Sequence, residues 1–254
     1  TGSPLSEESF KYIYSEVKND VHLASISGGT DIVGCFVQGN PNMPVFLGEI
    51  QVKGLGMDVD IFDEKGNSVK ETQGELVCKN NFPSQPIGFW NDDNNRNYYE
   101  TYYSKYNNVW HHGDFASETN NLGIKIFGRS DTTLNPRGIR IGTSEIYRQI
   151  NKFDEVIDSL AVSHGDEKII LFVKLSEKQK LDTNLIKKYK KNIKENTTSN
   201  HVPKLIIQVP DLPITKSGKL SEMSVKRIIN NQELNNIQSL ENPESIDFFR
   251  NLNL

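Results

Sequence analysis

Few residues of this chain belong to the types that build structural metal sites or disulfide frameworks. It contains 2 cysteines among 254 residues, Cys35 and Cys78, and they lack the close spacing of a metal-binding motif. Both lie in apolar stretches, so we expect them to be buried and unreactive. Two free thiols in a chain of this length fit a reducing compartment, which predicts a cytoplasmic protein.

Long apolar runs and an excess of basic charge are also missing. No apolar run approaches the ~18 residues that a helix needs to span a bilayer. The formal net charge is −4, so the overall charge would not attract nucleic acid. We therefore expect neither a membrane nor a nucleic acid as partner. A composition of 35% hydrophobic and 24% charged residues is typical of a globular protein, and the length allows two domains.

The signatures of two common hydrolase types are absent as well. His111 and His112 lie close to Asp114 and would fit a histidine–carboxylate base, but no G-x-S-x-G nucleophile motif accompanies them. No pair of the 5 histidines has zinc spacing with a third ligand. We expect the 2 tryptophans, Trp90 and Trp110, to pack in the core.

The first half of the chain has the pattern of a helix followed by short strands. Apolar residues at helical spacing predict a helix over residues 5–18, with Ser6 as its N-cap. Alternating apolar and polar residues predict strands within residues 48–79 and 123–131. Residues 80–100 are rich in Asn, Pro and aromatic residues, which indicates a surface loop with a short helix.

The pattern changes after residue 130. The predicted elements are a helix at 144–153 capped by Ser144, strands at 156–164 and 167–175, a helix at 181–197 and a strand at 204–209. This α-β-β-α-β order predicts a small α+β domain, and we place its boundary near Ser130 and Asp131. In the second helix Ile186, Tyr189 and Ile193 share one face. The lysine run of the same helix is interpreted as its solvated face, with at most a weak attraction for anions.

Five stretches place a charged or hydroxyl residue beside glycine on an expected loop. Arg and Lys neutralise phosphate, a carboxylate accepts ribose hydroxyls or binds Mg²⁺, and glycine lets backbone N–H groups reach phosphate oxygens. Each stretch alone is common enough to be an ordinary turn, but together they predict a nucleotide site. They are "SGGTD" (27–31), "HGD" (112–114), "GRSD" (128–131), "RGIR" (137–140) and "SGK" (217–219).

The order of these motifs resembles that of the adenylate-forming superfamily, which contains acyl-CoA synthetases, luciferases and the adenylation domains of peptide synthetases. The matching blocks are "SGGTDI", "GELV", "WHHGD", "GRSDTTLNPRGIRIGTSEI" and "PITKSGK", and the resemblance covers residues 1 to about 225. It implies an α/β plus α+β fold. Residues 1–130 would be the C-terminal part of the large domain, including a small β-barrel, and residues 131–254 a small mobile α+β domain.

Two departures from the superfamily pattern stand out. The Ser/Thr/Gly-rich phosphate loop that ends in Pro-Lys is absent, so we expect this chain to be the C-terminal part of a longer enzyme and to be inactive alone. Many relatives have Lys where this chain has Asn135, but acyl-CoA synthetases of the acetate type share the Asn.

The resemblance implies roles for residues in the first half of the chain. All of them would contact ATP or AMP, and one would also bind the metal ion. They are Gly2, Ser3 and Pro4 at the adenine, Gly29 in the ATP/AMP-binding loop, Thr30 at the α-phosphate, Asp31 near Mg²⁺, Asp114 at the ribose hydroxyls and Arg129 beside it.

The resemblance also implies roles in the second half. Asp131 matches the hinge about which the small domain turns, and Lys219 matches the catalytic lysine of adenylation. Gly218 would allow the turn that presents Lys219. A loop with Arg137, Gly138 and Arg140 matches the lining of the CoA tunnel, and Arg140 would also meet phosphate.

The implied substrates are ATP with Mg²⁺, CoA and a short acid, for which the resemblance points to acetoacetate and to ketone-body and lipid metabolism. Lys219 would bridge the carboxylate and the α-phosphate as an acyl-AMP forms, and CoA would then displace AMP. Acetylation would remove the charge of Lys219, which makes it a candidate for regulation. A non-catalytic nucleotide- or protein-binding module and a synthetase for another short acid remain as alternatives, and the oligomeric state is open.

Overall fold

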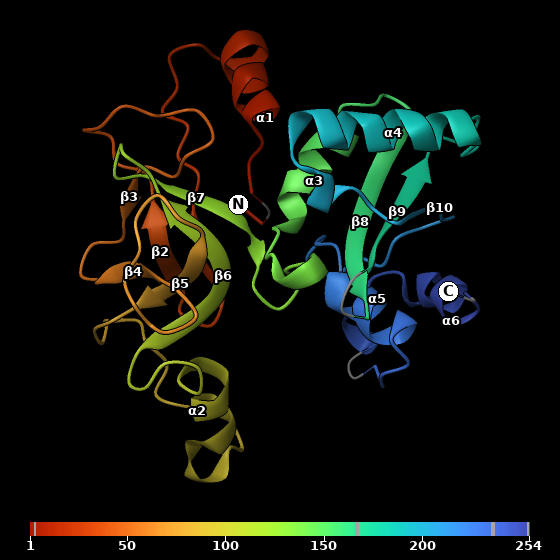
Figure 1. Ribbon diagram of the computed structural model, residues 1–254. Coiled ribbons are helices and arrows are strands. Elements are labelled where there is room, and N and C mark those ends of the chain that lie inside the picture. The colour runs from red at the N-terminus through yellow and green to blue at the C-terminus, as the bar shows by residue number, and fades with distance from the viewer. Residues whose placement is uncertain (3, 166–167, 235–236, 253) are drawn as a thin grey trace. The chain divides into compact units, whose positions relative to one another are not determined.

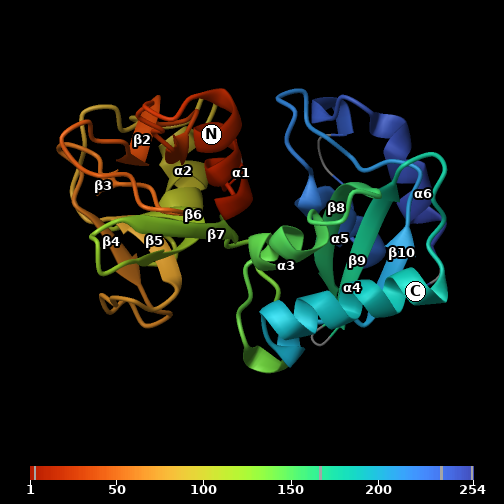
Figure 2. The same cartoon turned by 90° about the horizontal axis from the view of Figure 1, so that it is seen from above.

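The computed structural model describes residues 1–2, 4–165, 168–234, 237–252 and 254. The chain divides into two compact units, unit 1 at Thr1–Ser130 and unit 2 at Asp131–Leu254, and each is described by itself. Figures 1 and 2 show the elements of both units from two directions. Ser3, predicted at the adenine, lies outside the described residues, and so does the side chain of Arg137, predicted at CoA.

Unit 1 begins with the helix that the apolar spacing predicts. Helix α1 covers Glu7–Tyr12 and continues as a π-helical segment over Ile13–Val17. The Ser6 hydroxyl accepts a hydrogen bond from the Ser9 amide at 3.1 Å, which confirms the predicted N-cap. Phe10 is the buried residue of α1.

The strands of unit 1 form two antiparallel sheets. Among the described residues neither sheet closes on itself, so the expected small β-barrel is not observed. The first sheet has short strands, and an isolated bridge between Ile50 and Ile124 joins its region to the edge of the second. The sheets are β1-β2-β3, at Ser27–Gly29, Gly34–Gln38 and Val52–Lys53, and β4-β5-β6-β7, at Val59–Phe62, Gly74–Cys78, Trp110–Glu118 and Ile124–Arg129.

An aromatic cluster fills the space between helix α2 and strand β6. Helix α2 covers Arg96–Tyr102 and follows a 3₁₀ turn at Asp93–Asn95. Trp110 is 1% exposed, as predicted, but Trp90 is 93% exposed, so the prediction that it packs in the core is wrong. Trp90 lies in a turn ahead of the 3₁₀ segment, where no strand covers it.

The two thiols differ in their surroundings. Cys78 is buried, which confirms its prediction, whereas Cys35 is only half-buried. Burial raises the pKa of both thiols, which keeps them in the less nucleophilic protonated form.

Unit 2 is a three-stranded mixed sheet with helices on both faces. Strand β8 (Val156–His164) pairs antiparallel with β9 (Lys168–Leu175), which pairs parallel with β10 (Leu205–Gln208). The α-β-β-α-β order predicted from the sequence is observed, and further helices follow it. The helices are α3 at Thr143–Ile150, α4 at Thr183–Asn196, α5 at Glu222–Ile229 and α6 at Ile246–Arg250, with 3₁₀ turns at Pro136–Gly138, Ser199–His201, Ile237–Ser239 and Pro243–Ser245.

Alternating residues of the central strands divide the core of unit 2 into two clusters. Ala161 and Leu171 pack with residues of α3 and α4, whereas Leu160 and Phe172 pack with residues of α5 and α6. A sheet whose two faces are both covered explains why β8 and β9 read as apolar runs.

Helix α4 has the face that its pattern predicts, but the start of α3 differs from the prediction. Tyr189 and Ile193 of α4 are fully buried, with Ile186 packed beside them. The N-cap of α3 is Gly142 and not Ser144, which lies buried inside the first turn. The Glu145 carboxylate accepts from the Gly142 amide at 3.2 Å and supplies the capping contact instead. Within the described residues no helix combines the length and hydropathy required to cross a membrane.

Candidate nucleotide site

Strands β6 and β7 bring the carboxylate of Asp114 opposite Arg129. The Ser27 hydroxyl donates to Asp114 Oδ2 at 2.6 Å, and Arg129 Nη1 lies 3.4 Å from Oδ1. Arg129 also donates to the His112 carbonyl at 3.0 Å. Asp114 is 8% exposed, so a hydroxyl and a cation together compensate for the burial of its charge.

Gly113, between His112 and Asp114, leaves room for the arginine. Its φ is +81°, a conformation that favours glycine. A Cβ at this position would lie 2.6 Å from Nη2 of Arg129. The glycine of the "HGD" motif therefore has a steric role at the Asp114–Arg129 pair.

His112 is buried beside this pair, and its burial favours the neutral imidazole. Its Nε2 lies 3.7 Å from Asp114 Oδ2, beyond hydrogen-bond distance. Burial lowers the pKa of the imidazole, although the charges of Asp114 and Asp31 oppose this effect. The geometry therefore does not support the histidine–carboxylate base considered from the sequence.

The "SGGTD" motif was expected in a loop, but its first three residues form strand β1 and only Thr30 and Asp31 lie in the turn toward β2. A Cβ on Gly28 would lie 2.1 Å from the Gly34 carbonyl, so the pairing of the two strands requires glycine there. A Cβ on Gly29 would lie 1.9 Å from Asp31 Oδ1. Thr30 and Asp31 are both exposed in the turn that follows, where a ligand can reach them.

Tyr102 of helix α2 holds the Asp31 carboxylate. Its hydroxyl donates to Asp31 Oδ2 at 2.5 Å. Burial and the acceptor Asp31 raise the pKa of the phenol, so it stays protonated and remains a donor. Sequence reasoning missed this residue, because the two partners are separated by 71 positions and no motif contains Tyr102.

Asp31 is the one predicted metal ligand. In the described part of the chain no group of three or more His, Cys, Asp and Glu side chains could hold a metal ion. Mg²⁺ commonly uses one or two carboxylates and completes its shell with water and substrate phosphate oxygens. A single exposed aspartate therefore fits a magnesium ion that arrives with a nucleotide, and not a resident metal centre.

In unit 2, Lys219 lies at the end of a tight hairpin. The Thr215 amide donates to the Lys219 carbonyl at 2.7 Å, and the Gly218 amide donates to the Thr215 carbonyl at 2.7 Å. Gly218 has φ +79° and open space around it, as the turn requires. The Lys219 side chain is exposed.

The other predicted residues lie in exposed or half-buried loop positions. Asp131 is exposed at the start of unit 2, and its carbonyl accepts from Lys226 Nζ at 2.7 Å. Gly138 has φ +78° at the end of a 3₁₀ turn, and Arg140 is half-buried just before α3. Gly2 and Pro4 are exposed ahead of α1.

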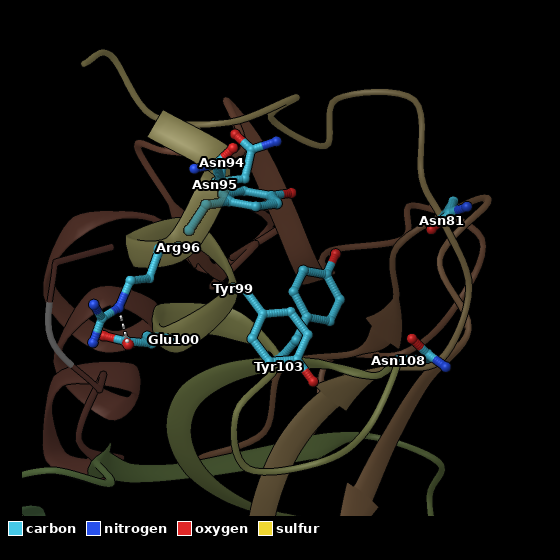
Figure 3. Close-up of a pocket in the computed structure, with 9 residues that line it drawn as sticks. Asn81, Asn94, Asn95, Arg96, Tyr99, Glu100, Tyr103 and Asn108 are labelled. Carbon is cyan, nitrogen blue, oxygen red and sulfur yellow. Dashed lines mark hydrogen bonds and ion pairs between the residues drawn. The ribbon is translucent and has the colours of Figure 1, made fainter. Parts of the chain in front are cut away.

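A separate open hollow of about 640 Å³ lies beside α2, and Figure 3 shows the side chains that line it. It contains none of the predicted site residues. Arg96 and Glu100 in its wall pair with each other at 2.9 Å, which reduces what either offers to a charged ligand. The lining residues are Asn81, Asn94, Asn95, Arg96, Tyr98, Tyr99, Glu100, Tyr103 and Asn108.

Comparison with known proteins finds relatives that share one name. The acetoacetyl-coenzyme A synthetase of Rhizobium meliloti is 48% identical over 255 residues, which is 99% of this chain and 39% of that protein. The Xenopus tropicalis acetoacetyl-CoA synthetase is 44% identical over 257 residues, which is 99% of this chain and 38% of that protein. The chain is a homologue of acetoacetyl-CoA synthetases. It spans about 39% of the length of the relatives it matches.

Solved structures agree with this homology. The acetoacetyl-CoA synthetase of Streptomyces lividans superposes with a TM-score of 0.91 at 36% identity, covering 98% of this chain and 39% of that one. A benzoate CoA ligase of Burkholderia xenovorans, at 22% identity, covers 89% of this chain and 44% of that one with a TM-score of 0.73, and shows the fold alone. The fold is that of adenylate-forming synthetases, with mixed sheets. No family model matches the chain.

Proposed function

We propose that the protein carrying this chain is an AMP-forming acid–thiol ligase that converts acetoacetate to acetoacetyl-CoA. Acetoacetate and ATP would give acetoacetyl-AMP and pyrophosphate, and the CoA thiol would then displace AMP. The observation that carries the proposal is the similarity to acetoacetyl-CoA synthetases over 99% of the chain. The pairing of Asp114 with Arg129 supports it, because a carboxylate beside a cation suits a nucleotide.

In this proposal unit 1 binds the nucleotide. Asp114 accepts hydrogen bonds from the ribose hydroxyls, and Arg129 orients that carboxylate. Thr30 and the loop glycines contact the α-phosphate, and Asp31 binds the magnesium ion that accompanies ATP. The ion, when bound, neutralises phosphate charge. Gly2, Ser3 and Pro4 pack on adenine.

Unit 2 supplies the cation for acid activation. Bringing a carboxylate to the α-phosphorus places two anions together, and Lys219 would stabilise the negative charge that develops between them. Asp131 would act as the hinge. Arg137, Gly138 and Arg140 would contact CoA, and Arg140 also phosphate.

A substrate panel tests the proposed reaction. The full-length protein is assayed for ATP–pyrophosphate exchange with acetate, acetoacetate and longer 3-oxo acids. We expect exchange with acetoacetate above all others. Higher exchange with another acid would correct the substrate, and no exchange with any acid would favour a non-catalytic binding module.

Lys219→Ala in the full-length protein should lower ATP–pyrophosphate exchange on the order of 10²–10³-fold, the usual cost of one transition-state donor. Thioester formation from supplied acetoacetyl-AMP should be spared, because that step does not need the cation. Acetylation of Lys219 should mimic this loss.

Lys216→Ala is the matched control, since Lys216 is an exposed lysine of the same hairpin. It should leave both half-reactions close to wild type. A Lys219→Ala enzyme that loses only the second half-reaction would contradict the assigned role.

A further inference from the structure

Tyr102 is held more firmly than an ordinary surface tyrosine of a short helix. It is 7% exposed, and its ring stacks on Trp110 with centroids 3.7 Å apart and an interplanar angle of 15°. The rings of Tyr98 and Phe89 also pack against it, with centroid distances of 5.4 and 5.7 Å. Because Trp110 is itself 1% exposed, the phenol oxygen has a fixed position relative to β6.

In contrast to the buried Tyr102, Asp31 lies on an exposed turn. Its two carboxylate oxygens nevertheless have defined neighbours. Tyr102 donates to Oδ2 at 2.5 Å. Oδ1 lies close to Gly29, and a Cβ built on that glycine would be 1.9 Å from it. Any other residue at position 29 would therefore clash with the carboxylate. An exposed aspartate without these contacts would sample several rotamers, and binding a ligand would then carry an ordering cost.

A phenol donor is well suited to this task. As a neutral group, it fixes the carboxylate without cancelling its charge, whereas a lysine or arginine would compete with a bound cation. Carboxylates that bind metals are commonly held by such outer hydrogen bonds, and loss of one typically costs about 10–100-fold in metal affinity.

We propose that Tyr102 is a positioning residue that orients the Asp31 carboxylate for a magnesium-bound nucleotide, with Gly29 providing the space. This inference rests on the proposed function, in which Asp31 faces the magnesium ion. Tyr102 itself would touch neither the metal nor the substrate.

The test is Tyr102→Phe in the full-length protein, which keeps the stacked ring and removes only the hydroxyl. ATP binding is measured by calorimetry at several Mg²⁺ concentrations and in EDTA. We expect binding in saturating Mg²⁺ to weaken about 10–100-fold, with binding in EDTA unchanged. Tyr99→Phe removes a hydroxyl from the half-exposed ring of the same helix and should match wild type in both conditions.

Two results for Tyr102→Phe would overturn the inference: a magnesium dependence equal to wild type, or an equal loss with and without Mg²⁺, which would indicate a purely structural role. Circular dichroism confirms that the variant is folded. If wild type itself shows no magnesium-dependent ATP binding, the proposed function fails and this inference with it, so the two failures are distinguishable.

Discussion

Gly113 illustrates how the absence of one side chain determines the geometry of a charged pair. The residue has positive φ, and the space where a Cβ would be is occupied by the Arg129 guanidinium. Arg129 in turn reaches both Asp114 and the His112 carbonyl. A larger residue at 113 would therefore displace the arginine, whose end is flexible, before it disturbed the strands.

Gly113→Ala is expected to lower both the unfolding free energy and the affinity for nucleotide, for two different reasons. The positive φ should cost about 1–2 kcal/mol of unfolding free energy, and displacement of Arg129 should weaken nucleotide binding by the full-length protein. Gly56→Ala is the control, because Gly56 has φ +78° but open space around it. Denaturant unfolding should show similar losses for both variants, with weaker nucleotide binding for Gly113→Ala alone. Equal nucleotide affinities would contradict the steric role of Gly113.

At this scale the sequence predicts charged motif residues better than their partners. Asp114 and Arg129 are visible because each lies in a short pattern with glycine. Ser27 donates to Asp114 across 87 positions, and no local pattern encodes a contact of that kind. Trp90 was predicted to be buried because tryptophan usually is, but a turn residue has no strand or helix to cover it.

Helix α5 carries a shielded carboxylate that joins several parts of unit 2. Glu222 accepts from the Tyr147 hydroxyl, and Tyr147 accepts from the Ala161 amide of β8 at 2.9 Å. Shielding from water raises the pKa of the Glu222 carboxyl, although hydrogen bonds from the hydroxyls of Tyr147, Thr132 and Thr143 oppose the rise. The folded protein therefore favours protonated Glu222 more than the unfolded chain does.

This shift gives a signed prediction for the dependence of stability on pH. A raised pKa contributes stability that is present below the ordinary glutamate range and is lost as pH rises through the folded pKa. Glu222→Gln resembles the protonated form at every pH. The unfolding free energy of wild type relative to this variant should therefore fall as pH rises above the ordinary glutamate range.

For Glu155, also in unit 2, the expected change of stability with pH has the opposite sign. Burial raises the pKa of Glu155, but hydrogen bonds from its own backbone amide and from Lys188 outweigh this and lower it. Wild type relative to Glu155→Gln should gain stability as pH rises through the acidic range. Parallel trends for the two glutamates in denaturant titrations would contradict both assignments.

Elements with a regular period were predicted well, and those without one were not. The strand at Val156–His164 was predicted with its observed bounds. Strand β6 was missed because nearly all of its residues are buried, so it shows no alternation. Ser144 looked like an N-cap, but the backbone turns one step earlier, at Gly142, where Glu145 reaches back to cap it. A closed barrel was expected from family resemblance, and local pattern does not encode how distant strands pair.

On the scale of the whole molecule, each unit has a hydrophobic core of its own. The cluster around Trp110 and Phe36 consists of residues from unit 1. The two clusters on the faces of the β8–β9–β10 sheet consist of residues from unit 2. A core built from one unit's own residues is the property expected of an independently folding domain.

We therefore expect residues 131–254, expressed alone, to fold. The fragment should unfold cooperatively in denaturant, because its sheet is covered on both faces by its own helices. The amides of β8 and β9 should be as strongly protected from hydrogen exchange in the fragment as in the full chain. A fragment without a cooperative transition would show that its stability depends on unit 1.

The two tryptophans differ in exposure, so their intrinsic fluorescence can be distinguished. Trp90 is 93% exposed and Trp110 is 1% exposed, and the chain has no other tryptophan. Acrylamide should quench the fluorescence of Trp90 readily and that of Trp110 hardly at all. Since the indole of Trp110 stacks on the ring that anchors Asp31, its residual emission offers a label-free signal for events at that carboxylate.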